Sequence, residues 1–396
     1  MTLRPAIVLG GDVNGLGQVR ALGRAGILVN VICAHRSEPA AHSKYASAIV
    51  VPKGGEYEAR LVNAIISLSR PDRGPVPLFA SSDAFVEFIA RNRDRLSESC
   101  ILNIVDDDTL FMVTDKIGSH DLAVRCGIRA PSLVPLAEFS DDRSLVDRFG
   151  YPALVKPRDS YTVAFPWKNF TAHAPADLEK VLDTWPELVP YALVQEIIPG
   201  PESGIYQCNV YIGKDVPTQF CTVQKLHQQP VGFGTMSFGR TRWNPPLVEE
   251  TARLLESVGY TGFASVEFKQ SSADGHFYLI EINPRLPWYN SLFAASGINF
   301  ALLAYRDLTG VEPEQVAVVE QIDDVYWLHL RNELRGAVER ARRGQWSAAA
   351  RELAGLWRSR AFGLFSVTDP LPFVVGYANY VRDFAATIRR KFAAGS

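Results

Sequence analysis

The sequence predicts an α/β domain followed by an α+β region and a helical C-terminal extension, and three observations predict this fold class. Strand-like and helix-like segments alternate over the first part of the chain, which is typical of βαβ units and a parallel sheet. From about Met112 the pattern changes to short apolar strands and helices without that regular alternation. Between residues 265 and 285, two strands separated by a turn carry two acids that are expected to face each other.

The first region carries the signals of a parallel sheet. The expected strands are Ala6–Leu9, Leu28–Cys33, Val76–Ala80 and Ile101–Val105, and the expected helices include Glu56–Leu68 and Ala84–Arg95. The turn after the first strand, residues 10–17, is rich in glycine, but its spacing fits neither common nucleotide motif. Arg20 stands where the dinucleotide fingerprint needs its third glycine, and Leu16 stands where a Walker-type loop needs lysine.

Two interpretations of this turn stay open. A close approach at a helix N-terminus suits a small anion such as a carboxylate, or the segment is only a tight strand-to-helix turn. On the first interpretation, the candidate substrate contacts are Gly11, Asp12 and Asn14. Asp83 follows another strand of this sheet, at the edge where open α/β sheets bind ligands, although it also suits a helix N-cap.

The second region begins with a helix that carries Lys116 and an apolar strand that ends in Lys156. A lysine at the end of an apolar strand needs a partner for its charge. The polar and aromatic stretch 158–170 is too irregular for a helix or strand and is expected to be a mobile loop. Further expected elements are Pro175–Trp185, Ala192–Ile198, Tyr206–Ile212, Pro217–Val223, Pro246–Val258 and Ala301–Thr309.

The two strands Ser265–Lys269 and Phe277–Arg285 are the most informative segments. As a hairpin with a three-residue loop, they place Glu267 directly opposite Glu281. The residues expected on the same face are Leu279 and Asn283. Facing like charges destabilise a sheet unless something neutralises them, and carboxylate and amide oxygens are suitable ligands for Mg²⁺. The alternative is that both acids face solvent and deter edge pairing.

Composition excludes several classes of protein. A formal net charge of −2 gives no sign of nucleic-acid binding. No apolar run is long enough to span a bilayer, and the start of the chain lacks the apolar region of a signal peptide. The five cysteines are widely spaced without a C-x-x-C pattern, which favours reduced thiols. A cytoplasmic location is therefore expected.

Five motifs follow one another in a set order through the second region. They are Asp115-Lys116, Val155-Lys156-Pro157, Gln195-Glu196-Ile197-Ile198-Pro199-Gly200, Val266-Glu267-Phe268 and Glu281-Ile282-Asn283-Pro284-Arg285. This series resembles the ATP-grasp superfamily, and within it the carboxylate-amine ligases, including the amino-acid ligases. The resemblance implies an ATP-grasp fold whose domains are a Rossmann-like domain at 1–112, a central subdomain at 113–192, a subdomain with the metal site at 193–312 and a basic, mostly helical extension at 313–396.

The resemblance also implies a role for each matching residue. The implied contacts to ATP are Lys116 and Lys156 on the phosphates, Gln195, Glu196, Ile197 and Ile198 along adenine, and Glu202 at the ribose. The implied ligands of one or two Mg²⁺ ions, with Mn²⁺ as an alternative, are Glu267, Glu281 and Asn283. Arg285 would face the γ-phosphate and, with Lys156, offset charge during phosphoryl transfer, which makes these two the implied catalytic residues.

The implied reaction joins a small-molecule carboxylate to an amine, with an amino acid as the expected substrate, through an acyl phosphate and with release of ADP. The alternatives are a kinase of the same fold that phosphorylates a hydroxyl and a nucleotide-binding protein without catalysis. The segment 158–168 contains no glycine, unlike the usual glycine-rich flap of the superfamily, so an aromatic lid is the expected means of excluding water. The segment 232–242 is expected to be a glycine-punctuated loop, and further candidate substrate contacts are its residues Arg240 and Arg242, together with Trp288.

The C-terminal part of the chain is basic. Residues 325–396 contain twelve Lys or Arg and five Asp or Glu, a formal charge of +7. Helices are expected around 332–343 and 347–358. We favour a helical appendage with solvated faces, and peripheral attachment to a membrane is the alternative. The sequence is also compatible with a homodimer.

Overall fold

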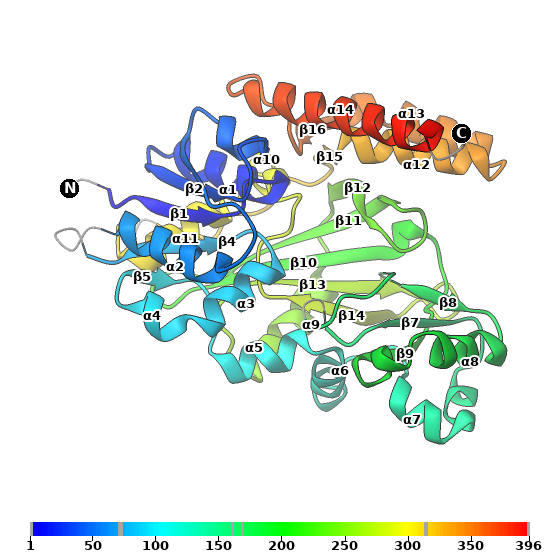
Figure 1. Ribbon diagram of the computed structural model, residues 1–396. Helices are drawn as coiled ribbons and strands as arrows, with labels where there is room; N and C mark the ends of the chain where they lie inside the picture. The colour runs from blue at the N-terminus through cyan, green and yellow to red at the C-terminus, as the bar shows by residue number, and fades with distance from the viewer. Residues whose placement is uncertain (1–2, 70–73, 160–161, 168, 313–315, 394–396) are drawn as a thin grey trace.

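A computed structural model describes residues 3–69, 74–159, 162–167, 169–312 and 316–393. In these residues the chain forms three β-sheets of five, four and seven strands, each flanked by helices (Figure 1). The five-stranded sheet comes from the N-terminal region, and the seven-stranded sheet forms the middle of the molecule. The predicted combination of a parallel α/β domain with an α+β region is confirmed.

The N-terminal sheet is parallel throughout, in the order β3-β2-β1-β4-β5. Its strands are β1 (Ala6–Leu9), β2 (Val29–Cys33), β3 (Ala46–Val50), β4 (Val76–Ala80) and β5 (Cys100–Leu102). The connecting helices are α1 (Val13–Gly23), the 3₁₀ turn η1 (Pro39–His42), α2 (Tyr57–Leu68), α3 (Asp83–Arg91) and α4 (Arg93–Ser97). The sequence did not predict β3, an edge strand without a fully buried residue, and the helix expected at 84–95 is divided at Asn92.

The four-stranded sheet has antiparallel neighbours in the order β6-β9-β7-β8. Its strands are β6 (Leu133–Pro135), β7 (Ala153–Pro157), β8 (Phe170–Ala172) and β9 (Ala192–Glu196). Its helices are α7 (Leu136–Asp141), η3 (Arg143–Arg148), α8 (Pro175–Thr184) and η4 (Pro186–Tyr191), and α5 (Asp107–Thr114) and α6 (Lys116–Arg125) join it to the N-terminal sheet. The central position of β7 carries Lys156 into the interior of the molecule.

The seven-stranded sheet has the order β14-β13-β10-β11-β12-β15-β16 and is antiparallel except between β15 and β16. Its strands are β10 (Ile205–Ile212), β11 (Gln219–Gln229), β12 (Thr235–Thr241), β13 (Gly262–Gln270), β14 (Phe277–Asn283), β15 (Tyr326–Leu328) and β16 (Ser359–Phe362). Its helices are η5 (Glu202–Gly204), α9 (Pro245–Glu256), α10 (Ser291–Ala295) and α11 (Phe300–Thr309). The segment expected to be a glycine-punctuated loop, 232–242, is mostly the strand β12.

The C-terminal extension is part of this sheet as well as a set of helices. The expected helices correspond to α12 (Leu330–Arg342) and α13 (Trp346–Ala354), which is followed by the 3₁₀ turn η7 (Leu356–Arg358). The last helix of the described residues is α14 (Leu371–Ala393). Between these helices, β15 and β16 add two strands to the edge of the large sheet. The helices lie along the upper edge of the molecule in Figure 1.

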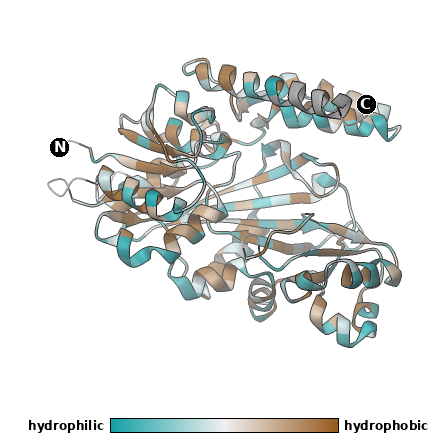
Figure 2. Ribbon diagram, in the orientation of Figure 1, coloured by the Kyte–Doolittle hydropathy of each residue, from teal (hydrophilic) through white to brown (hydrophobic). Residues whose placement is uncertain are grey.

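One hydrophobic core joins the N-terminal domain to the large sheet and to the C-terminal extension. It contains Leu16 and Val19 of α1, Tyr289 after β14, and Trp327 of β15. A buried ion pair spans the same junction, since Arg20 Nε lies 2.9 Å from Asp369 Oδ2. In Figure 2 the strands of the N-terminal sheet are mainly brown, whereas those of the large sheet mix brown with teal. The large sheet therefore buries polar side chains, and these lie beside a cavity.

Candidate functional site

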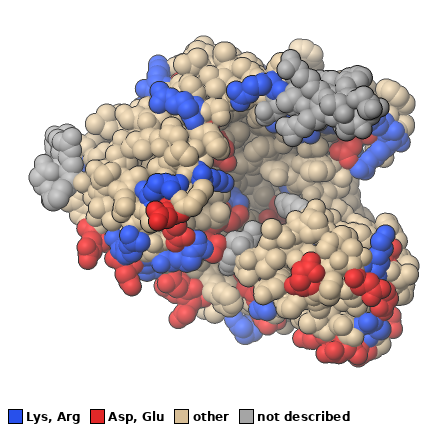
Figure 3. Space-filling model, viewed as in Figure 1, with Lys and Arg blue, Asp and Glu red and all other residues tan. Residues whose placement is uncertain are grey.

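A cavity of about 820 Å³ lies between the large sheet and the four-stranded sheet. Figure 3 shows the molecule deeply hollowed at its centre, below the C-terminal helices and beside the N-terminal domain. The cavity is lined by the twelve residues that carry the ATP, metal and catalytic assignments or flank the hairpin: Lys116, Lys156, Gln195, Glu196, Ile197, Ile198, Glu202, Glu267, Glu281, Asn283, Arg285 and Trp288. The fold therefore brings together motifs that lie far apart in the sequence.

The two acids of the hairpin face each other as the sequence predicts. In the β13–β14 ladder Glu267 pairs with Glu281, and Ser265 pairs with Asn283. Glu267 Oε2 accepts hydrogen bonds from Gln207 Nε2 at 2.7 Å and from Lys225 Nζ at 3.2 Å. Asn283 Nδ2 donates to Glu281 Oε1 at 3.0 Å. Two carboxylates and an amide thus converge on one side of the ribbon.

The position predicted for Leu279 is wrong. A β-bulge shifts the register after Glu267. Phe268 therefore pairs with Leu279, whereas uninterrupted pairing would place Phe268 opposite Ile280. Leu279 consequently packs in the apolar core with Phe268 and Ile282, on the face away from the acids. Ile280, the residue displaced by the bulge, lines the cavity in its place. A strict two-residue period cannot anticipate such an insertion.

Glu267, Glu281 and Asn283 fit a hard divalent cation that keeps some of its waters. Mg²⁺ is commonly held by one or two carboxylates together with waters and substrate phosphates, rather than by a complete protein cage. The described residues contain no cluster of three or more His, Cys, Asp or Glu placed to hold a metal ion. Gln207 Oε1 is buried beside Glu267 without a partner, which leaves one more oxygen ligand available at this position.

Lysines from three different strands and one helix surround the same cavity. Lys156 is only 6% exposed on β7, and Lys116 at the start of α6 donates from Nζ to the carbonyl oxygen of Arg158 at 3.3 Å. Lys225 of β11 and Lys269 of β13 are also buried cavity residues, and no local pattern in the sequence indicates them. Burial lowers the pKa of Lys269, whose ammonium donates to the carbonyl oxygen of Gly200 at 3.0 Å. Four ammonium groups around one cavity are compatible with binding of an anionic ligand.

The segment after β9 forms one wall of the cavity. β9 is paired on both sides, and it ends at Glu196, two residues earlier than the sequence predicts. Glu196 accepts a hydrogen bond from the backbone N–H of Ser132 at 3.0 Å through Oε2. Ile197 and Ile198 continue the wall beyond the sheet. This arrangement offers an apolar surface with a backbone edge to a flat ligand.

Glu202 lies at the junction between the cavity and the C-terminal extension. Its carboxylate accepts hydrogen bonds from the backbone N–H groups of Gly232 at 2.9 Å and Gln228 at 3.3 Å. Arg340 Nη2 of α12 lies 2.6 Å from Glu202 Oε2, and the same guanidinium also pairs with Glu352 of α13. Three segments thus fix the orientation of the Glu202 side chain.

Arg285 is held in place by the N-terminal domain. Its Nε and Nη2 atoms donate to the two oxygens of Asp83 at 2.8 and 2.7 Å, a bidentate ion pair. Burial alone would lower the pKa of Arg285, but Asp83 and the nearby acids Glu281 and Asp12 raise it above its ordinary value. Ser82, rather than Asp83, caps helix α3. Asp83 therefore orients a cation at the edge of the cavity.

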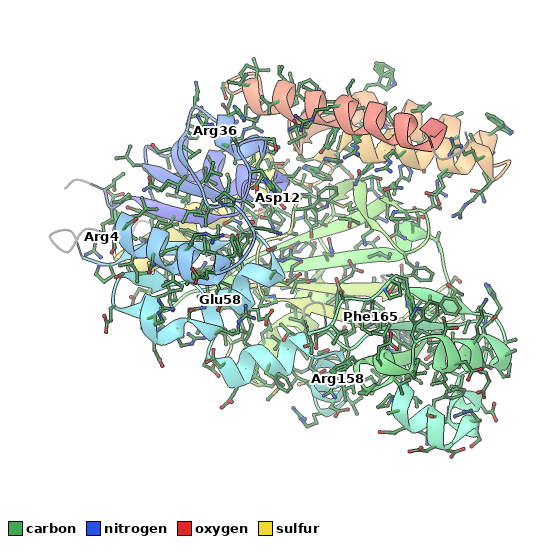
Figure 4. All side chains as sticks on the ribbon, in the orientation of Figure 1. Arg4, Asp12, Arg36, Glu58, Arg158 and Phe165 are labelled. Atoms are coloured by element: carbon green, nitrogen blue, oxygen red, sulfur yellow. The ribbon has the colours of Figure 1, made fainter. Side chains whose placement is uncertain are left out.

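The glycine-rich turn of the N-terminal domain contains Asp12, one of the acids whose charge raises the pKa of Arg285. Asp12 caps helix α1 through the N–H groups of Asn14 and Gly15. Figure 4 shows Asp12 at the inner margin of the N-terminal domain, with Arg158 and Phe165 on the opposite lobe. The N–H of Gly11 donates to Glu38 at 2.7 Å. The turn is therefore held mainly by contacts within the protein.

Five of the six candidate substrate contacts lie outside the cavity lining: Gly11 and Asp12 of the turn, and also Asn14, Arg240 and Arg242. Asn14 is buried, donates to the carbonyl oxygen of Leu286 at 2.7 Å and so links α1 to the end of the hairpin. Arg240 Nη1 lies 2.8 Å from Asp324 Oδ1 and also contacts Tyr326, and Arg242 lies 3.9 Å from the same carboxylate. Through these contacts the side chains of Asn14, Arg240 and Arg242 each join two segments of the fold. Trp288, by contrast, lines the cavity, and its Nε1 is buried without a partner.

The loop after Lys156 covers part of the cavity with aromatic and apolar side chains. Val163, Ala164, Phe165 and Trp167 line it, and Trp167 packs against Phe165, Phe170 and Trp185. Arg158 anchors the start of the loop through an ion pair of 2.5 Å with Asp115. Ser160, Tyr161 and Lys168 lie outside the described residues.

Comparison with known proteins identifies relatives of this architecture. No family model matches the chain. The chain is 24% identical over 319 residues to D-aspartate ligase from Enterococcus faecium, covering 76% of each protein. A shorter stretch of 66 residues is 36% identical to acetyl-CoA carboxylase 2 of Oryza sativa, but it covers only 17% of this chain and 3% of that protein.

Solved structures show the same fold at low sequence identity. The ADP complex of N5-carboxyaminoimidazole ribonucleotide synthetase aligns with a TM-score of 0.62 and 11% identity, covering 82% of this chain and 81% of that one. The biotin carboxylase domain of 2-oxoglutarate carboxylase from Hydrogenobacter thermophilus, solved with MgADP, aligns with a TM-score of 0.65 and 15% identity, covering 82% and 74%. These alignments show that the chain shares the fold of both enzymes, and the expected ATP-grasp fold is confirmed.

Proposed function

We propose that the protein is an ATP- and Mg²⁺-dependent ligase that joins a carboxylate to an amine. The observation that carries this proposal is the meeting of Glu267, Glu281 and Lys156 in one cavity with Arg285 at its edge. Phosphoryl transfer needs little covalent help from a protein and depends on positioning and on charge stabilisation. The similarity to a D-aspartate ligase over 76% of the chain supports the class of reaction.

In this proposal ATP lies across the cavity. Lys116 and Lys156 contact its phosphates, the wall from Gln195 to Ile198 contacts adenine, and the Glu202 carboxylate accepts hydrogen bonds from the ribose hydroxyls. Glu267, Glu281 and Asn283 would hold Mg²⁺, which supplies neutralising charge to the triphosphate when bound. Lys225, through its contact with Glu267, and Lys269 provide additional positive charge at the same place.

The reaction has two steps. A substrate carboxylate oxygen attacks the γ-phosphorus, the bond to the β-phosphate oxygen breaks, and ADP leaves an acyl phosphate. The amine nitrogen then attacks the acyl carbon, phosphate departs, and the nitrogen loses a proton to give the amide. Arg285, oriented by its bidentate pair with Asp83, contacts the transferring phosphoryl group and stabilises its charge in both steps.

The aromatic loop excludes water from the acyl phosphate. Trp167 and Phe165 belong to an apolar cluster that also includes Trp185, so the segment closes the cavity through packing instead of through a flexible glycine-rich flap. An acyl phosphate hydrolyses if water reaches it before the amine does. The absence of glycine from 158–168 is therefore consistent with a ligase.

Two assays test this proposal. Release of ADP is measured with D-aspartate and then with a panel of amino acids, singly and in pairs, in the presence of Mg-ATP. Hydroxylamine is then added, because it converts an acyl phosphate into a hydroxamate but leaves a phosphorylated alcohol unchanged. A hydroxamate with any carboxylate of the panel supports the ligase. ADP release together with a phosphate ester product would instead identify a kinase, and binding of Mg-ATP without ADP release under every condition would indicate a protein that only binds nucleotide.

A further inference from the structure

The surface of helix α13 combines exposed tryptophans with exposed arginines. Trp346 is 71% exposed, Trp357 is 74% exposed and Leu353 is 43% exposed. Their spacing of seven and four residues places them along one side of α13 and of η7, the turn that follows it. Arg343, Arg351 and Arg358 are also exposed in and next to this segment, with Arg351 on a different side of α13 from Leu353. These six residues are called the α13 surface below.

The exposed side chains of the C-terminal extension carry a more positive charge than the sequence alone indicates. Between Val325 and Arg382, all of which the structure describes, Glu333, Glu352 and Asp369 are buried, and Glu339 is half-buried and paired with Arg343. None of the acids in this range is exposed, whereas most of the arginines are. The burial of the acids leaves a basic surface. This surface bears on the choice between the two interpretations of the extension, a helical appendage with solvated faces or peripheral attachment to a membrane.

The acids are buried because they hold the extension together. Glu333 accepts hydrogen bonds from His227 at 2.6 Å and from Ser237 at 2.6 Å, and Asp369 pairs with Arg20. Glu352 pairs with Arg340. These three carboxylates are thus neutralised internally, and among the outer arginines Arg343 pairs with the half-buried Glu339.

We propose that the α13 surface attaches the protein peripherally to an anionic lipid membrane. Tryptophan rings with an apolar body and a polar N–H are favoured at the boundary between lipid headgroups and acyl chains, and arginines beside them attract anionic headgroups. The exposure of Trp346 and Trp357 means that both rings project from the surface, which suits insertion into a boundary layer. None of the helices in the described parts of the chain is long and apolar enough to cross a bilayer, so the attachment is peripheral.

The positive charge of the α13 surface favours an anionic membrane over a second copy of the chain as its partner. Two copies that met through the same patch would place Arg343, Arg351 and Arg358 of each against those of the other, and like charges across an interface oppose association. An anionic bilayer complements the arginines and accepts the apolar side chains at the same time. Helix α14 also turns Leu371, Val374 and Val381 outwards, while Phe373 and Tyr377 pack against the core.

Vesicle sedimentation of the full-length chain tests the proposal without nucleotide, so its result is independent of the proposed ligase activity. The vesicles contain phosphatidylcholine alone or phosphatidylcholine with phosphatidylglycerol. We expect binding only to the anionic vesicles, and release at about 0.5 M NaCl because salt screens the arginines. The double variant W346A/W357A and the triple variant R343S/R351S/R358S should each bind about tenfold more weakly or worse.

Matched variants on other surfaces serve as controls. W243A removes a tryptophan that is 43% exposed, and R125S/R148S/R253S removes three exposed arginines elsewhere in the chain. Both controls should bind vesicles like the unmodified protein, and thermal unfolding checks that every variant is folded. Lack of binding to anionic vesicles at low salt, or equal losses in the α13 variants and their controls, would overturn the proposal. A change in oligomeric state of W346A/W357A with unaltered vesicle binding would do so as well, in favour of a second copy.

Discussion

At the scale of single residues, the site depends on charges that the fold buries before any ligand is present. Lys156 and Lys225 lie in the interior, and Glu267 is almost as inaccessible. Burial of a charge is costly unless partners compensate it, and Lys225 and Glu267 compensate each other at 3.2 Å. The sequence could indicate Lys156, because it ends an apolar strand. It could not indicate Lys225, which has no local signal and reaches Glu267 only through the pairing of β10 with both β11 and β13.

The first prediction concerns Lys156. The variant K156M keeps the apolar stem and removes the ammonium, so it should weaken binding of Mg-ATP about tenfold to a hundredfold, the usual range for loss of a hydrogen bond between charged groups. Isothermal titration calorimetry measures the change. The control K180M removes an exposed lysine of α8 and should leave the affinity unchanged. Equal affinities of K156M and K180M would exclude Lys156 from the phosphate site.

The second prediction concerns His227. Burial lowers the pKa of this imidazole, but the hydrogen bond to Glu333 and the nearby acids outweigh burial and raise the pKa above its ordinary value of 6.5. A pKa that is raised in the folded state contributes stability below the unfolded value, and this contribution is lost as the pH rises through the folded value. Chemical denaturation should therefore show a free energy of unfolding that falls as the pH rises above 6.5.

The control for that pH dependence is a pair of histidine variants. H227Q should flatten the decline, because the charge of the imidazole causes it, and H173Q, which removes an exposed histidine, should preserve it. A decline of the same size in H227Q would mean that another group titrates.

At the scale of elements, long periodic segments were predictable and short ones that depend on distant partners were not. The β13–β14 ribbon was found from its alternation, its turn and its two acids. β12 was missed because Gly234 and Gly239 interrupt its pattern, and the Cβ of any residue at Gly239 would lie 2.9 Å from the carbonyl oxygen of Gln224. β15 and β16 contain three and four residues and gain their hydrogen bonds only by joining a sheet formed elsewhere in the chain.

The third prediction concerns the contact between α12, α13 and the cavity. In R340M the carboxylates of Glu202 and Glu352 lose the guanidinium they share, so the free energy of unfolding should fall by about 3 kcal/mol, as expected when one member of a buried ion pair is removed. Urea denaturation measures the loss. R343M, which breaks an exposed pair within α12, should cost about 0.5 kcal/mol or less. Similar losses in both variants would contradict the structural role of Arg340.

At the scale of the whole molecule, the C-terminal extension and the N-terminal domain both complete the central site. Asp83 of α3 orients Arg285, Arg340 of α12 holds Glu202, and the Arg20–Asp369 pair joins the two outer parts. The sequence predicted the α/β and α+β regions and the residues that meet in the cavity, because these follow local patterns and a family resemblance. It could not predict that an apparent appendage supplies two strands and a cavity contact, since both depend on long-range pairing.

The central claim is that Glu267 and Glu281 bind Mg²⁺ against the phosphates of ATP. Calorimetric titration with ATP, in Mg²⁺ and in EDTA, tests it on the unmodified protein, on E267Q/E281Q and on E249Q/E256Q, which neutralises two exposed acids of α9. The account predicts that Mg²⁺ strengthens binding at least about tenfold in the unmodified protein and in E249Q/E256Q, but not in E267Q/E281Q, which should bind ATP equally well with and without the ion. The same Mg²⁺ dependence in all three proteins, or no binding of ATP to the unmodified protein, would contradict it.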